Sequence, residues 1–171
     1  VTVAGVQSAG GTCSDSQYTT EAECEAAMGS SDSDNWQNQY HNDTVYFENV
    51  VVTESVTGFQ ASADYPDGYT VFWVQDQGAG DWSGLYVFYF NNDAPVSTGD
   101  VINLTGKVES RYYHTQMVLS DSTDVEILSS ESVPTSTILT TTPVDWEMYE
   151  GMLVTLESAA IANVDQYGNY N

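Results

Sequence analysis

The sequence predicts a mostly β protein whose central part forms a small closed barrel. Four successive runs there are rich in Val, Ile, Phe, Tyr, Trp and Thr, the residues that favour strands. Clusters of Gly, Asn, Asp, Ser and Pro separate the runs, which indicates turns between paired strands. The four expected strands cover residues 70–76, 85–90, 101–109 and 116–120.

A further strand is expected before these four, at residues 44–54, and its apolar pattern changes side within the run. Val45 and Phe47 share one face of an extended chain, whereas Val50 and Val52 have the opposite parity. Such a slip indicates a β-bulge, here near residues 48–49. A bulge bends a strand and lets it serve two sides of a closed barrel.

The chain before residue 44 predicts one strand and one helix. Residues 1–7 contain spaced valines and predict a short strand. Thr20 and Glu23 form a capping-box pattern, and Gly29 is a typical helix stop. We therefore expect a short helix between these signals.

The two cysteines of the chain, Cys13 and Cys24, flank the start of this expected helix. Their even number, close spacing and polar surroundings predict a local disulfide in an oxidising compartment. Residues 12–29 would then be an insertion that the disulfide holds against the loop before it.

Residues 30–43 are polar and predict a loop. Asp32, Asp34 and Asp43 have spacing similar to part of a calcium-binding loop, but the glycine and glutamate of an EF-hand are missing. Two interpretations stay open, a loose Ca²⁺ site and a solvated loop. No other cofactor is expected.

Three more strands and a short helix are expected after the central region: strands over residues 124–128, 151–158 and 160–164, and a helix over residues 143–149. The first of these, over residues 124–128, would continue the fifth strand of the barrel, over residues 116–120. A Ser/Thr-rich connection follows it, which Val133, Ile138 and Leu139 would hold against the barrel.

Together these elements predict a five-stranded barrel of the oligonucleotide/oligosaccharide-binding (OB) type, with additional terminal strands and one or two short helices. Residues 1–142 would form the barrel with its helical insertion. Residues 143–171 would form a C-terminal helix and strand extension that can pair with a neighbouring subunit or domain.

The charge of the chain restricts its partners. Twenty-five acidic residues and two basic ones, Lys107 and Arg111, give a formal net charge of −23. Proteins gain affinity for nucleic acid by neutralising phosphates with Lys and Arg, so this composition disfavours nucleic acid and anionic membranes.

The sequence has no apolar run of about 18 residues, which excludes a membrane-spanning helix. It begins with Val and shows no signal-peptide pattern, which predicts a processed mature chain. The negative charge and the two cysteines predict that the protein is secreted or at the cell surface.

Several segments in order resemble the OB-fold region that precedes the nuclease domain in secreted bacterial endonuclease/exonuclease/phosphatase-type enzymes. They are VTVAGVQ, VYFENVVVTES, GYTVFWVQD, WSGLYVF, STGDVINLTGKVES, HTQMVL and YEGMLVTLES, between residues 1 and 158. In that family this region is an accessory module, and the hydrolytic residues lie in a later domain. The resemblance therefore implies a binding module without catalytic residues of its own.

The residues themselves offer no catalytic group. His41 and His114 are far apart in sequence and lack the neighbours that a catalytic base needs. Glu147 and Glu150 would lie on one turn of a surface helix, which is not the arrangement of a glycosidase carboxylate pair. We expect no enzymatic activity.

Aromatic residues are the candidates for ligand contact. Alternation along the strands turns about half of them inward, and Phe72 and Val74 share a face that excludes Trp73. We expect most to pack in the core. The ligand-binding candidates are those in loops, Trp82, Tyr112 and Tyr113.

The sequence leads to two functional hypotheses. In the first, the protein is a structural subunit of an extracellular fibre or surface assembly, a homopolymer joined by β-strand addition. The assembly strands would be the terminal ones, with Val1, Val3, Val6, Met152, Val154 and Leu156. In the alternative, it is an accessory nucleic-acid- or polysaccharide-binding domain of a secreted nuclease.

The sequons at Asn42 and Asn103 are candidate glycosylation sites.

Overall fold

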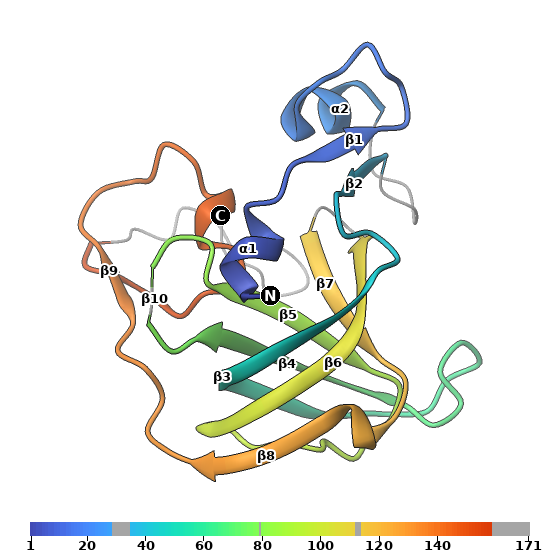
Figure 1. Ribbon diagram of the computed structural model, residues 1–171, viewed down its shortest axis with the longest axis vertical. Coiled ribbons are helices and arrows are strands. Elements are labelled where there is room, and N and C mark those ends of the chain that lie inside the picture. Colours follow the sequence, from blue (N-terminus) through green and yellow to red (C-terminus); the bar gives the residue numbers. More distant parts are fainter. Residues whose placement is uncertain (29–34, 79, 112–113, 159–171) are drawn as a thin grey trace.

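The computed structural model describes residues 1–28, 35–78, 80–111 and 114–158 (Figure 1). Five of its strands close into a barrel in the order β3-β4-β5-β7-β6, and β6 pairs back with β3. The pairs are antiparallel except β5–β7, which is parallel. This strand order is that of an OB barrel, and it confirms the predicted fold class. The barrel strands are β3 (Thr44–Phe59), β4 (Tyr69–Asp76), β5 (Gly84–Tyr89), β6 (Asp100–Arg111) and β7 (His114–Leu119).

The barrel encloses a continuous apolar core. Its side chains come from alternate positions of each strand, as expected for a closed sheet with one face inward. The largest fully buried ones are Phe47, Phe72, Leu85, Ile102, Leu104, Met117 and Leu119.

The predicted bulge in β3 is present. The register of β3 against β6 shifts between Phe47 and Val50, so that both side chains enter the core. Asn49 has a left-handed φ of 55°, and its backbone N–H donates to the side-chain oxygen of Asn103 at 3.2 Å. The strand continues five residues beyond the predicted end, to Phe59, through two further register shifts against β4.

The prediction of a strand over residues 1–7 is wrong, because Val3–Gln7 form the short helix α1. Thr2 caps the helix by accepting from the Gly5 N–H at 3.0 Å. The Asp76 carboxylate accepts from the first helical N–H groups, at 3.2 Å and 3.0 Å. Val3 and Val6 have helical spacing, and both are fully buried in the barrel core. They are therefore unavailable as an edge strand.

The segment between α1 and β3 projects from one end of the barrel (Figure 1). It contains α2 (Glu21–Met28) and a two-stranded sheet of β1 (Gly11–Cys13) with β2 (Trp36–Asn38). The expected helix is confirmed, although its predicted stop at Gly29 lies outside the described residues. The expectation that residues 30–43 form a loop is wrong in part, because residues 36–38 form β2, which pairs with β1.

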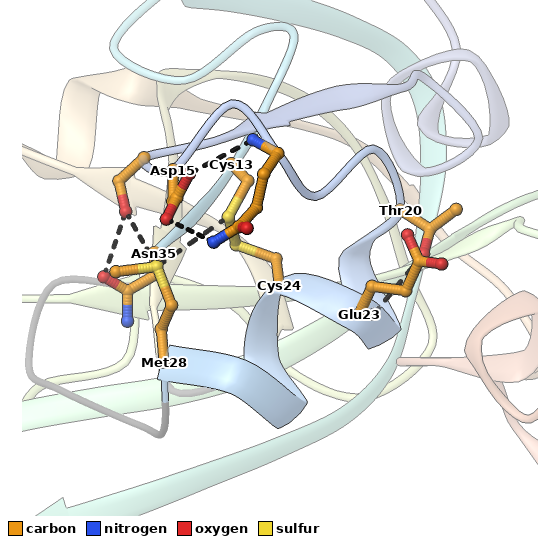
Figure 2. The surroundings of a disulfide bond; sticks show 9 residues. Cys13, Asp15, Thr20, Glu23, Cys24, Met28 and Asn35 are labelled. Carbon is orange, nitrogen blue, oxygen red and sulfur yellow. Dashed lines mark hydrogen bonds between the residues drawn. A yellow bond between two sulfur atoms is a disulfide. The ribbon is translucent and has the colours of Figure 1, made fainter.

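The predicted disulfide joins Cys13 of β1 to Cys24 of α2, with their Cα atoms 5.7 Å apart (Figure 2). Cys24 is fully buried. Thr20 accepts from the Glu23 N–H at 3.4 Å, as the capping pattern predicted. Disulfides of this kind persist in oxidising compartments.

The chain after β7 adds one strand to the barrel and a small separate sheet. A turn of 3₁₀ helix, η1 (Ser122–Asp124), leads into β8 (Val125–Ser130), which pairs with β6. The expectation that this segment continues the fifth strand is therefore wrong. The small sheet pairs β9 (Thr137–Leu139) in parallel with β10 (Val154–Leu156). The predicted strand at 160–164 lies outside the described residues.

Between β9 and β10 the chain crosses the β4–β5 hairpin, and we call residues 147–153 the strap. It begins with the 3₁₀ turn η2 (Glu147–Tyr149), where a longer helix was expected. The Trp82 N–H donates to the Met148 carbonyl at 2.7 Å, and the Leu153 N–H donates to the Gln75 side chain at 3.2 Å.

Among the described residues, no helix has the length and apolar character to cross a membrane.

Candidate functional site

The candidate site lies on the outer surface of β4 and β5. Alternation turns Phe72 and Val74 into the core and leaves Trp73 on the opposite side, as the sequence predicted, and Tyr69 lies on the same outer side as Trp73. Along β5, Tyr86 and Phe88 point outward in the same way, and each remains partly exposed. The outer surface of this part of the barrel therefore carries rings that do not belong to its core.

Five aromatic rings on this outer surface form one cluster, which we call the aromatic face. They are Phe59, Tyr65, Tyr69, Phe88 and Phe90. Tyr69 lies at its centre, with ring centroids 4.3 Å from Phe59, 5.0 Å from Tyr65 and 5.1 Å from Phe88. Tyr65 comes from the β3–β4 loop and also contacts Phe88 and Phe90. The β3–β4 loop, the strands β3, β4 and β5, and the residue just after β5 thus present a continuous ring surface.

A second group of rings continues this surface toward β7. Tyr86 lies edge-on to Trp73, with centroids 5.4 Å apart, and edge-on to His114, with centroids 5.0 Å apart. Burial, with smaller effects from Tyr69 and Tyr65, raises the pKa of Tyr86 to about 12. Its phenol therefore stays protonated at neutral pH and can donate a hydrogen bond.

A pocket of about 190 Å³ lies between the two groups of rings. One part of its wall is aromatic and the other is polar. The residues that line it are Tyr65, Tyr69, Tyr86, Phe88, Arg111, His114 and Gln116. It therefore combines flat apolar surfaces with hydrogen-bonding groups, the usual composition of a small-ligand site.

A groove of about 310 Å³ lies on the other side of Trp73. Thr53 and Glu54 of β3 form one wall, and the strap residues Met152 and Leu153 form the other. The strap can lie this close because two glycines meet there. A Cβ atom on Gly84 would overlap the backbone of Gly151, which has a φ of 66°.

The predicted ligand residues differ from those that the structure brings together. Trp82 lies in the β4–β5 turn with a φ of 69°, fixed to the strap by its backbone N–H, and it is not part of the aromatic face. Tyr112 and Tyr113 lie outside the described residues. Tyr65 and Tyr69 are not among the predicted ligand residues, although the parity of Tyr69 relative to Phe72 is a usable signal for an outward ring.

The histidines and the glutamate pair do not form a common site in the described part of the chain. The Nδ1 atom of His41 accepts from the Ser110 N–H at 3.1 Å, whereas His114 packs against Tyr86. Glu147 and Glu150 lie on η2 and its end. Burial raises the pKa of Glu147, and a hydrogen bond with Glu150 partly offsets that rise.

The calcium hypothesis stays a prediction. Asp32 and Asp34 lie outside the described residues, and Asp43 is exposed just before β3. Within the described ranges, no three His, Cys, Asp or Glu side chains gather as metal ligands would.

The two sequons differ in their surroundings. The Asn42 side chain is exposed, and its oxygen accepts from Lys107 at 3.4 Å. The Asn103 amide nitrogen, to which a glycan would attach, donates to Glu126 at 2.8 Å. Asn42 is therefore the more accessible candidate in the folded chain.

The segments proposed for strand addition are occupied within the chain. Val1 is exposed, but its ammonium group donates to the Tyr46 carbonyl at 3.3 Å, and the residues after it form α1. Val154 and Leu156 pair with β9, and Met152 is buried. These segments give the fibre hypothesis no support.

Comparisons with known proteins add little to this geometry. A scan against protein-family models finds no match, and a search of curated proteins finds none either. Among solved structures, the chain is similar to the second OB-fold domain of replication protein A from Methanococcus maripaludis, with 15% sequence identity. The match covers 54% of this chain and 88% of that one, with a TM-score of 0.37. A similarity this weak carries no functional argument, and the OB assignment rests on the strand order of the barrel itself.

Proposed function

We propose that the chain is a non-catalytic carbohydrate-binding module whose ligand stacks on the aromatic face. The observation that carries this proposal is the cluster of five outward rings on β4, β5 and adjoining segments, with centroid separations between 4.3 Å and 6.1 Å. The barrel fills its interior with other residues, so these rings are not needed for its core. Contiguous apolar surface on the outside of a soluble protein commonly marks a binding site.

The position of the rings supports the same conclusion. OB barrels bind oligonucleotides and oligosaccharides on the outer face of their second and third strands and with the adjoining loops. Here those strands are β4 and β5, and Tyr65 comes from the loop between the first and second barrel strands. The aromatic face thus lies where barrels of this topology bind extended ligands.

Charge favours a saccharide over a nucleic acid. A nucleic acid brings one phosphate per nucleotide, whereas the chain has two basic residues and a net charge of −23. A neutral sugar ring brings no charge, and its C–H face can pack against an aromatic ring. The net charge therefore opposes the polyanion and does not oppose the neutral glycan.

We propose that the chain acts outside the cell, as a module that holds a secreted protein on a glycan. The Cys13–Cys24 disulfide supports an oxidising compartment. We do not propose the fibre role, because the described parts of both terminal segments pair or pack within their own chain.

The test is binding of the full chain to a panel of neutral oligosaccharides of β-linked glucose, xylose and mannose, with single-stranded DNA as a further arm. Tyr65→Ala should weaken binding to the glycan by about tenfold, the typical loss for an aromatic contact residue. Tyr46→Ala is the matched control, because Tyr46 is 44% exposed on β3 and lies outside the aromatic face. Binding to no neutral glycan, or tighter binding to DNA at physiological salt, would contradict the proposal.

A further inference from the structure

The pocket between the two groups of rings has a polar wall that glycan stacking alone does not use. Arg111 and His114 are register partners at the end of the β6–β7 ladder, and both line the pocket. Gln116 follows on β7, is 4% exposed and also lines the pocket. A guanidinium, an imidazole and an amide thus face a set of aromatic rings.

The location of Arg111 is significant because the chain has so few cations. Of its two basic residues, Lys107 does not line the pocket. Arg111 is the one that does. A guanidinium presents paired donors in a plane, a geometry that matches a carboxylate.

The size of the pocket restricts its occupant. A volume of about 190 Å³ is smaller than the roughly 300–1,000 Å³ typical of sites for drug-sized ligands. It suits one six-membered ring in contact with the aromatic residues of the wall. A longer ligand would have to continue outside the pocket over the aromatic face.

We infer that this pocket takes a single acidic sugar, a hexuronic acid unit whose ring packs on the aromatic wall and whose carboxylate pairs with Arg111. This inference rests on the proposed function and adds the class of sugar. The remainder of the ligand is neutral. A polymer with a charge on every unit would place its further anions against a surface of net charge −23, with one cation at the site to receive them.

The experiment is an NMR titration of the full chain with four small probes. They are the methyl glycosides of glucuronic and galacturonic acid, and those of glucose and galactose, which carry a primary alcohol in place of the carboxylate. At least one acid probe should bind about tenfold more tightly than its neutral counterpart, as expected for a charge-assisted hydrogen-bonded pair. Shifts should include His114 and Gln116.

Three variants make the result specific. Arg111→Gln should reduce the affinity for the acid to that of the neutral sugar, and Arg111→Lys should retain part of the preference because it keeps the charge without the planar donors. Ser16→Asp is the control. It lowers the net charge by the same one unit as Arg111→Gln, at an exposed position between the cysteines, and should leave the preference intact.

Equal affinity for acidic and neutral probes, an acid preference that survives Arg111→Gln, or no binding of any probe would overturn the inference. So would a thymidine tetranucleotide that binds through Arg111 more tightly than the uronides. Failure here leaves the proposed function standing if neutral oligosaccharides bind and Tyr65→Ala weakens them, because that binding does not depend on Arg111.

Discussion

Gly84→Ala tests the contact that holds the strap on the barrel. The new methyl group would overlap the backbone carbon of Gly151 and the backbone nitrogen of Met152, and it would lie 2.5 Å from the Gly151 carbonyl oxygen. These are backbone atoms, so a side-chain rotation cannot relieve the overlap. The strap must therefore move away from the β4–β5 hairpin.

The cost follows from what the strap loses when it moves. The hydrogen bonds of Trp82 with Met148 and of Leu153 with Gln75 would break, at about 1 kcal/mol each. Met152, which is 9% exposed, would lose its burial, worth about 2 kcal/mol. We expect the free energy of unfolding to fall by about 2–4 kcal/mol, and the melting temperature by roughly 5–15 °C.

Urea unfolding and amide hydrogen exchange measure this effect. The Leu153 amide should lose protection while the amides of β6 keep theirs. Gly78→Ala is the matched control, since an added Cβ there meets no atom within 4 Å, and it should change stability by less than about 0.5 kcal/mol. An unchanged urea midpoint in Gly84→Ala, with Leu153 still protected, would refute the close approach of the two glycines.

Two further predictions concern Tyr86 and the disulfide. The pKa of Tyr86 is raised from 10.0 to about 12, so its neutral form stabilises the fold fully below pH 10, and this contribution is lost as the pH rises from 10 toward 12. Tyr86→Phe should remove one late-ionising phenol from a tyrosinate absorbance titration; loss of a phenol that ionises near pH 10 instead would contradict this. Replacing Cys13 and Cys24 by Ser should release α2, at a cost of about 3 kcal/mol to the local structure, and leave the barrel intact. Hydrogen exchange that shows loss of protection throughout β3–β7 would contradict the separation of this segment from the barrel.

Some of the site was predictable from the strands, and some was not. Alternation alone placed Trp73 opposite Phe72, because successive side chains in a strand point to opposite faces. It could not bring Tyr65 onto Tyr69 and Phe88, because those contacts depend on how the β3–β4 loop folds back over the sheet. The expectation that aromatic residues in loops contact the ligand therefore pointed to Trp82. Its backbone N–H is instead bonded to the strap, and its ring is not part of the aromatic face.

The N-terminal segment shows a second limit. Valines at positions 1, 3 and 6 fit a short strand as well as a helix, and the local pattern does not decide between them. Asp76, distant in sequence, accepts hydrogen bonds from the first helical N–H groups, and the end of the barrel buries Val3 and Val6. Tertiary contacts therefore select the helix.

By itself, the sequence determined the barrel class, the bulged first barrel strand, the disulfide pair and the strongly negative charge, because each follows from local periodicity or from composition. Tertiary structure alone decided that five rings meet on one outer face, that Arg111 shares a pocket with three of them, and that the strap covers the hairpin beside it. Those arrangements join residues far apart in the chain, and the closure of the barrel sets their distances.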